Sequence, residues 1–177
     1  MQKYVALLRG IAPAFPNMKN KDLCGVLERE GFAGAQSVLS SGNIIFEADK
    51  ADVKAWERQL EAAWPKRLGF KATTVIKSEK ELARLLAADP FAGVEHGGKS
   101  YLLVTFFKHR PKLGFELPHR PEGKPFRFVH YANGALFSVT DTTMPGDPGG
   151  WLERQYGKEM TSRTPQTVER ILRKMAG

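Results

Sequence analysis

The amino-acid sequence predicts an α+β protein with antiparallel sheets that carry their helices on one face. Two observations predict this fold class. The elements expected in residues 1–77 follow the order βαββαβ, and residues 78–177 hold a similar set of elements around one long proline-rich loop. The order βαββαβ is typical of ferredoxin-like folds. We therefore expect two ferredoxin-like units packed together, an N-terminal subdomain at 1–77 and a degenerate α+β subdomain at 78–177.

In the first unit, β-branched and aromatic runs predict strands, and stretches of helical spacing between them predict two helices. Asn20 is the expected N-cap of the first helix, which ends at Gly31. Asp49 or Asp52 begins the second helix, which ends at Gly69. The handedness of crossovers places the third strand between the first two and antiparallel to both. The expected strands are 3–9, 35–39, 44–47 and 70–76.

The second unit begins with a helix after Ser78, because Ser78 and Glu81 have the spacing of a capping box. Residues 100–107 are almost continuously apolar, so we expect them to form a central strand. Asn133-Gly134 is typical of a type I′ turn that joins two strands of a hairpin. The remaining elements are strands at 126–131 and 135–140 and helices at 151–156 and from Thr164-Pro165 onward.

A first candidate site follows from the ferredoxin-like layout, which brings the end of the first strand beside the start of the third. Arginine, serine and asparagine donors would then gather near the N-terminus of the first helix, where the helix dipole favours an anion. A phosphate or carboxylate would suit this corner, although turn formation alone would also explain these residues. The residues concerned are Arg9, Gly10, Asn20, Ser41, Gly42 and Asn43.

A second candidate lies before the last helix, where Thr161, Ser162, Arg163 and Thr164 place hydroxyl groups and an arginine at a helix entrance. This arrangement suits an anion, and ordinary helix capping is the alternative. Asp141, with Thr140, Thr142 and Thr143 beside it, is a further polar group, which a loop after a strand would explain.

A third candidate is the proline-rich stretch at 108–127, which carries a formal charge of +4 from six basic and two acidic residues. Phe115 and Phe126 lie among these cations, and aromatic rings between cations can stack the bases of single-stranded nucleic acid. The alternative is a surface loop whose phenylalanines anchor it to the core. The cations are Lys108, Arg110, Lys112, Arg120, Lys124 and Arg127.

Composition narrows the class of protein. The formal net charge of +8 raises the expectation of an anionic partner, nucleic acid included. The single cysteine, Cys24, cannot form an internal disulfide, and the N-terminus lacks the pattern of a secretory signal, so we expect a cytoplasmic protein. The longest apolar run, 101–107, is too short to cross a bilayer, so no membrane association is expected.

Residues with catalytic or cofactor chemistry form no recognisable pattern. The four histidines are scattered without metal-ligand spacing, so we expect no metal site. The phosphate-binding loop, the dinucleotide fingerprint and the nucleophile elbow are absent, so we expect no cofactor. Cys24 lies beside the apolar stripe of a helix, which is typical of a small buried hydrophobe.

Several motifs resemble a known family. They are Tyr4 to Ile11, the helix that ends in Gly31-Phe32, Ser41 to Phe46, Asp89-Pro90-Phe91, and Thr161 to Arg163 followed by Thr167-Val168. In this order and spacing they resemble the bacterial proteins of the domain of unknown function DUF1697. The resemblance implies a cytoplasmic protein with two ferredoxin-like subdomains, and it implies no activity.

The chain departs from the family pattern after Arg9-Gly10-Ile11 and before its last helix. The family usually continues the first motif with Asn-Val-Gly-Gly, where this chain has Ala12-Pro13-Ala14-Phe15. A glycine-rich loop binds anions through its backbone N–H groups, and Pro13 has none to offer. The family usually enters its last helix through Arg-Asn-Trp-Asn-Thr, where this chain has Arg163-Thr164-Pro165-Gln166-Thr167.

The sequence thus favours a protein that binds an anionic small molecule or nucleic acid, without an identifiable reaction. An enzyme that acts on a phosphorylated or carboxylated metabolite through Arg9, Asn43 and Arg163 is one alternative, and a protein-interaction module is another. The sequence leaves the ligand, the oligomeric state and the biological process open.

Overall fold

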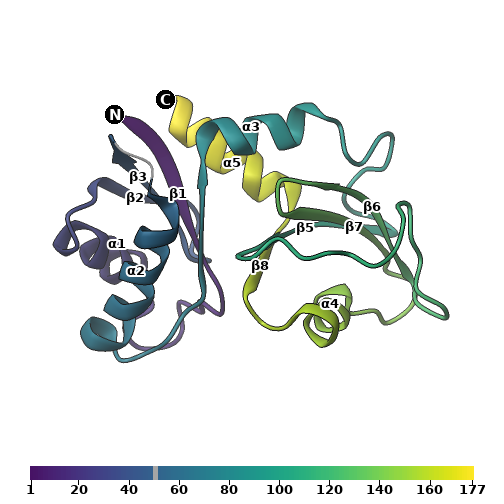
Figure 1. Ribbon diagram of the computed structural model, residues 1–177, viewed down its shortest axis with the longest axis horizontal. Coiled ribbons are helices and arrows are strands. Elements are labelled where there is room, and N and C mark those ends of the chain that lie inside the picture. The colour runs from purple at the N-terminus through teal and green to yellow at the C-terminus, as the bar shows by residue number, and fades with distance from the viewer. Residues whose placement is uncertain (50–51) are drawn as a thin grey trace. The chain divides into compact units, whose positions relative to one another are not determined.

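The structure is a computed structural model that describes residues 1–49 and 52–177 (Figure 1). The chain divides into two compact units, one formed by 1–82 with 169–177 and the other by 83–168. In the described residues, eight strands form two four-stranded antiparallel sheets, and five helices accompany them. The predicted α+β class is confirmed, and both sheets are consistent with ferredoxin-like units. The boundary between residues 77 and 78 stays a prediction.

The sheet of the first unit has the strand order β2-β3-β1-β4. As predicted, β3 lies between β1 and β2 and is antiparallel to both. The loop before α1 contains Gly10, Pro13 and Pro16. Gly69, in the αL conformation, ends α2. The elements are β1 (Gln2–Leu8), α1 (Asn20–Arg29), β2 (Ala33–Ser37), β3 (Asn43–Ala48), α2 (Val53–Leu68) and β4 (Thr74–Ser78).

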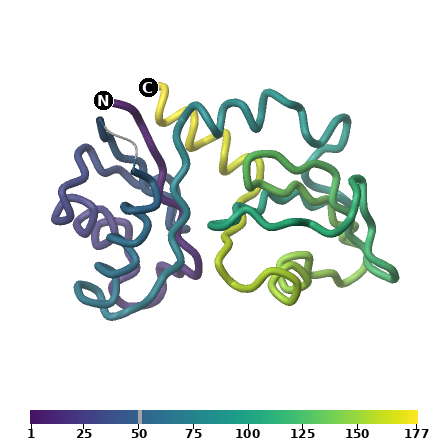
Figure 2. Tube along the Cα trace, viewed as in Figure 1, coloured from purple at the N-terminus to yellow at the C-terminus, as the bar shows by residue number. Residues whose placement is uncertain are grey.

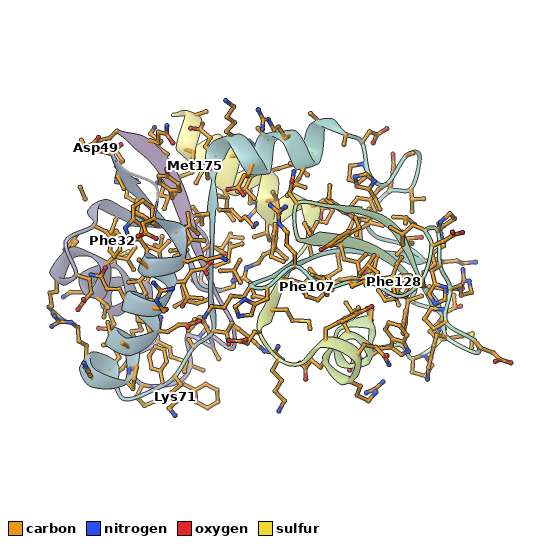
Figure 3. The ribbon with its side chains drawn as sticks, in the orientation of Figure 1. Phe32, Asp49, Lys71, Phe107, Phe128 and Met175 are labelled. Atoms are coloured by element: carbon orange, nitrogen blue, oxygen red, sulfur yellow. The ribbon has the colours of Figure 1, made fainter. Side chains whose placement is uncertain are left out.

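Alternate residues of β1 face the helices, and their packing forms the core of the first unit. Tyr4, Ala6 and Leu8 are buried against the apolar faces of α1 and α2. Four aromatic rings, from Tyr4, Phe32, Phe46 and Trp56, form a cluster with centroid separations between 4.9 and 5.9 Å. Phe32 marks this cluster among the side chains of Figure 3. The helix-facing side of the sheet is therefore filled with rings.

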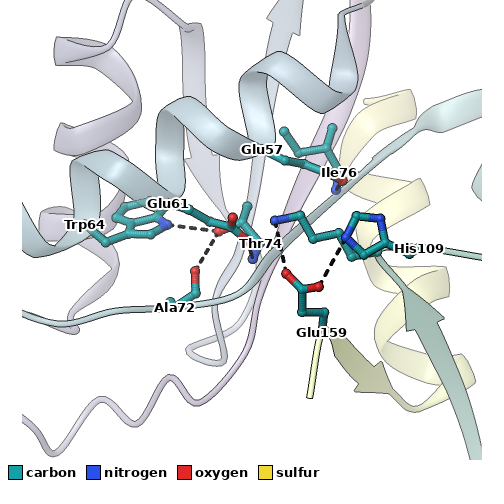
Figure 4. Close-up of polar contacts among 9 residues, drawn as sticks. Glu57, Glu61, Trp64, Ala72, Thr74, Ile76, His109 and Glu159 are labelled. Carbon is teal, nitrogen blue, oxygen red and sulfur yellow. Dashed lines mark hydrogen bonds and ion pairs between the residues drawn. The ribbon is translucent and has the colours of Figure 1, made fainter. Parts of the chain in front are cut away.

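The edge strand β4 is protected by carboxylates from α2 (Figure 4). Glu57 Oε1 accepts the Ile76 N–H at 2.9 Å, and Glu61 Oε1 accepts the Thr74 N–H at 2.9 Å. The two glutamates are four residues apart, so they share one face of the helix. Exposed strand edges can pair with other chains, and these contacts occupy two of the edge donors.

The second unit has the strand order β6-β7-β5-β8, the same arrangement as in the first. The predicted central strand is confirmed, because β5 (Ser100–Phe107) lies between β7 and β8. The predicted turn is also confirmed, because Asn133 and Gly134 have φ values of 51° and 77°. The other elements are α3 (Glu79–Ala87), β6 (Phe126–Ala132), β7 (Ala135–Asp141), α4 (Pro148–Tyr156), β8 (Met160–Arg163) and α5 (Pro165–Ala176).

Equivalent backbone hydrogen bonds show which residues of the two sheets correspond to each other. The Leu8 N–H donates to Gly42 O at 2.8 Å, and the Phe107 N–H donates to Gly134 O at 2.8 Å. The next residue of each strand repeats the agreement, since the Arg9 N–H donates to Thr73 O at 2.9 Å and the Lys108 N–H to Glu159 O at 3.0 Å. Leu8 of the first unit therefore corresponds to Phe107 of the second, although the sequences show no repeat.

The second unit lacks a helix between its first two strands, and the proline-rich segment 108–125 replaces it. Leu113, Phe115 and Leu117 pack against the core cluster that contains Phe107, Phe128 and Leu152. Phe107 and Phe128 are labelled in Figure 3. The intervening residues are exposed, so the segment alternates like a strand. The His119 N–H and the Phe128 N–H donate to each other's carbonyl oxygens at 2.9 and 2.8 Å. The segment thereby covers the edge of β6.

Candidate functional site

The structure brings Arg9 and Asn43 to the same end of the first sheet. Leu7 pairs with Asn43, and Arg9 follows two residues after Leu7. Asn43 begins β3, and the positive φ values of this turn belong to Leu39 (59°) and Gly42 (76°). The spatial relationship expected from the ferredoxin-like order is therefore present.

The polar groups of this corner hold the turn together. Asn43 is buried, and its Nδ2 donates to Val38 O at 3.0 Å and to Ser41 Oγ at 2.9 Å. Gly42 has no room for a side chain, because a Cβ there would lie 2.7 Å from Ile11 Cγ1. An amide nitrogen carries two protons, so the donors of Asn43 are already used. Anion binding here stays a prediction that depends on the charge of Arg9.

The predicted role of Asn20 as an N-cap is wrong. The N-cap of α1 is Lys19, and Asn20 is the first helical residue. Asn20 Nδ2 instead donates to Leu39 O at 2.9 Å and joins the helix to the turn. The side-chain oxygen of an N-cap asparagine accepts a helix N–H, whereas here the Asn20 side-chain nitrogen donates to a loop carbonyl.

The second predicted group lies largely in a strand and not at a helix entrance. Thr161, Ser162 and Arg163 belong to β8, which pairs with β5. Arg163 is buried, and its Nη1 donates to Thr161 Oγ1 at 2.7 Å and to Ser162 O at 2.8 Å. Burial lowers the pKa of the Arg163 guanidinium to about 10. Thr164 is the residue that caps α5, since its Oγ1 accepts the Thr167 N–H at 3.3 Å.

The basic segment places its cations and its rings in different environments. Lys112, Arg120 and Lys124 are exposed, whereas Phe126 is buried and Phe115 stacks on His119 at 4.3 Å. The rings are thus occupied by protein contacts, and the nucleic-acid hypothesis depends on charge. It stays a prediction.

The cations at the start of the segment have partners within the second unit. Lys108 Nζ lies 3.8 Å from Glu159 Oε1, and His109 Nε2 lies 3.1 Å from Glu159 Oε2 (Figure 4). The stem of Arg110 lies over Gly134, where an added Cβ would be 3.3 Å from Arg110 Cγ. Arg127 is half-buried on β6. These contacts fix the segment to the sheet.

A basic groove in the first unit is absent from the sequence-based predictions. It has a volume of about 480 Å³ and is lined by Lys3 of β1, by Arg173 and Lys174 of α5, and by Glu47 of β3. The Lys3 Nζ donates to Met175 O. The two ends of the chain lie close together in the trace of Figure 2. The cations come from positions about 170 residues apart in sequence, and no local motif connects them.

Neither a cluster of metal ligands nor a membrane-spanning helix is found among the described residues. Across residues 1–49 and 52–177, no three His, Cys, Asp or Glu side chains gather as metal ligands would. No helix in the same ranges is long and apolar enough to cross a membrane. Cys24 is half-buried, and burial raises the pKa of its thiol, so its thiolate is disfavoured.

The strand order of both sheets defines an α+β protein with two similar ferredoxin-like units. A family model for a protein of unknown function (DUF1697) matches residues 1–118. The match covers about two thirds of the chain, so the chain belongs to this family, as its motifs predict. The matched part ends within the proline-rich segment.

The comparison with solved structures finds similarity over the whole chain. One such structure is the conserved bacterial protein SP0830 from Streptococcus pneumoniae, with a TM-score of 0.70 and 17% sequence identity, over 100% of this chain and 99% of that chain. At this identity the likeness shows a shared fold alone. A search of curated proteins finds no match.

Proposed function

We propose that this chain binds a small carboxylated or phosphorylated molecule in the basic groove of the first unit. The proposal is carried by the convergence of Lys3, Arg173 and Lys174 on one groove of about 480 Å³. Glu47 is the acidic side chain among the described lining residues. The volume lies within the range of small-molecule sites, which is roughly 300 to 1,000 Å³.

The cations of the groove differ in whether they are exposed for binding a ligand. Basic residues in the last turn of a helix compensate the negative end of its dipole, and Arg173 and Lys174 have this position in α5. Lys3 already donates to Met175 O. Arg173 and Lys174 are exposed, and an arginine fork can bind a carboxylate or phosphate with two hydrogen bonds. They are therefore the residues to test.

The test uses isothermal titration with citrate and ATP as probes of the two anion classes. Arg173→Gln and Lys174→Gln should each raise the Kd by about fivefold or more, which corresponds to roughly 1 kcal/mol. Lys112→Gln is the matched control, because it removes the same charge from an exposed site in the second unit. Equal weakening by all three variants, or no binding of either probe, would refute the proposal.

Nucleic acid is the second candidate partner, favoured by the exposed cations Lys112, Arg120 and Lys124. A mixed-sequence single-stranded oligonucleotide tests it. Binding through these residues predicts a negative slope of log K against log salt that becomes shallower by about 0.7 for each cation removed from a single-strand contact. An unchanged slope in the Lys112→Gln variant would exclude that residue from the contact.

A further inference from the structure

The two units differ at one pair of equivalent positions on the helix-facing side of their sheets. In the first unit, Tyr4 pairs with Phe46, and the two rings stack at 5.7 Å. Leu8 corresponds to Phe107, so Tyr4 corresponds to Leu103, which pairs with Ser138. The second unit thus has a leucine and a serine where the first has two stacked rings.

An open groove of about 530 Å³ covers this position in the second unit. Its floor is formed by Tyr101, Leu103, Thr140 and Ser162 of the sheet, and its wall by the segment 142–149. Tyr101 and Met144 are large apolar side chains that are 43% and 55% exposed. Exposed apolar side chains that gather in a concavity are typical of ligand sites.

Two hydroxyl groups at this position lack a hydrogen-bond partner in the part of the chain that the structure describes. They are Ser138 Oγ and Thr140 Oγ1, although the two residues are only 1% and 6% exposed. Thr140 lines the groove, and Ser138 lies two residues before it on the same face of β7. Buried hydroxyls are nearly always paired, so these two require an external partner. The neighbouring Ser162 Oγ is already 2.8 Å from Thr105 Oγ1.

The charges around the groove favour an uncharged ligand. Asp147 is the carboxylate among the described lining residues, which include no Lys, Arg or His. Its Oδ1 accepts the Gly150 N–H at 2.9 Å and caps α4, so the carboxylate and the helix N-terminus offset each other. The floor residues Tyr101 and Leu103 and the wall residues Met144, Pro145 and Pro148 contribute apolar surface.

We infer that the second unit binds an uncharged aromatic or heteroaromatic molecule with a hydrogen-bonding edge. The ring lies against Tyr101, Leu103 and Met144, in the region that corresponds to the aromatic cluster of the first unit. The polar edge of the ligand, a carboxamide or a ring nitrogen with its neighbouring N–H, bonds the hydroxyl of Thr140 and reaches toward Ser138. A hydroxyl both donates and accepts, so an edge with both functions satisfies it. This site is independent of the basic groove and of its anion.

Titrations of the full chain with three probes, followed by ¹⁵N-HSQC spectra, test separately whether the site binds the ring and the polar edge of the ligand. Benzamide has a ring and an amide edge, toluene has the ring alone, and acetamide has the edge alone. Benzamide at millimolar concentration should shift the amides of Tyr101, Thr140 and 144–149, with toluene weaker by fivefold or more and acetamide without effect. Absence of these shifts with benzamide, or equal shifts with acetamide, would overturn the inference.

Two substitutions test the residues. Thr140→Val preserves the shape and removes a hydroxyl without a protein partner, so it should weaken benzamide at least fivefold without lowering the unfolding midpoint. Met144→Ala should also weaken benzamide, and Phe15→Ala, at an exposed apolar residue of the first unit, is its control. Unchanged affinity of the Thr140→Val variant for benzamide would refute the site.

Discussion

Replacement of Gly42 by alanine tests whether the corner between β1 and β3 is a packed turn. Gly42 has a φ of 76°, a conformation that costs an L-residue about 1–2 kcal/mol. Its added Cβ would also meet Ile11 Cγ1 at 2.7 Å and Leu8 Cβ at 3.0 Å. Overpacking of this kind costs about 1–3 kcal/mol. Gly42→Ala should therefore destabilise the first unit by about 2–5 kcal/mol.

Gly10 provides the control for the backbone term. It has nearly the same φ, 75°, and an added Cβ there would have no heavy atom within 4 Å. Gly10→Ala should therefore cost only the conformational part, about 1–2 kcal/mol. The difference between the two variants measures the steric contact with Ile11.

Urea unfolding followed by circular dichroism measures both variants, and hydrogen exchange of the Leu8 amide, which donates to Gly42 O, gives a local readout. Combination of Gly42→Ala with Ile11→Ala should recover about 1–2 kcal/mol relative to the sum of the single effects, because it removes the closest clashing atom. If Gly42→Ala costs no more than Gly10→Ala, or if the double variant shows no recovery, the proposed packing of this corner is incorrect.

Three further predictions concern side chains of the first unit. Glu57→Ala should cost about 1–3 kcal/mol in urea unfolding, because the Ile76 N–H loses its acceptor, and Glu57→Gln should cost less because it retains an oxygen; equal costs would contradict this. The pH midpoint of Cys24 alkylation should lie above that of a free thiol, because burial and then Glu28 raise its pKa, and Glu28→Gln should lower the midpoint. The hydrogen bond from Arg67, at 2.7 Å, lowers the pKa of Glu30, so the pair stabilises above the unfolded pKa and is lost as pH falls through the folded value. Arg67→Ala should therefore cost about 0.2–1 kcal/mol at neutral pH and nothing once Glu30 is protonated, and a cost that persists in acid would argue against the ion pair.

Local signals in the sequence predict much of the fold. The run 100–107 is a central strand with the expected bounds, and Asn133-Gly134 forms the expected turn. The Ser78–Glu81 box is also formed, since the Glu81 N–H donates to Ser78 Oγ at 3.2 Å and the Ser78 N–H to Glu81 Oε2 at 2.9 Å. In each case the determining residues lie within one stretch of at most eight residues.

The strand β8 could not be predicted from local signals. It has four residues, and Thr161, Ser162 and Arg163 have no apolar alternation. Its stability comes from pairing with β5, such as Thr105 with Ser162, at a separation of 57 residues in sequence. Polar residues can form a strand when long-range pairing and burial override their propensity.

The hydrogen-bond partners of the candidate site residues also could not be predicted from local signals in the sequence. The sequence places Arg9 and Asn43 together, but the acceptors that use the Asn43 donors, Val38 O and Ser41 Oγ, become evident only in the folded turn. The hydroxyls of Ser138 and Thr140 look like ordinary strand residues until the structure shows that they have no partner among the described residues.

Replacement of a crossover helix by the segment 108–125 affects how the second unit folds. A helix gains many contacts between near neighbours, whereas this segment must find its contacts with Phe128 and Leu152 by closing a loop. A higher contact order slows folding, so the second unit should reach its native pairing after the first. During synthesis on the ribosome, the first sheet would then be able to form while the strands of the second are still unpaired.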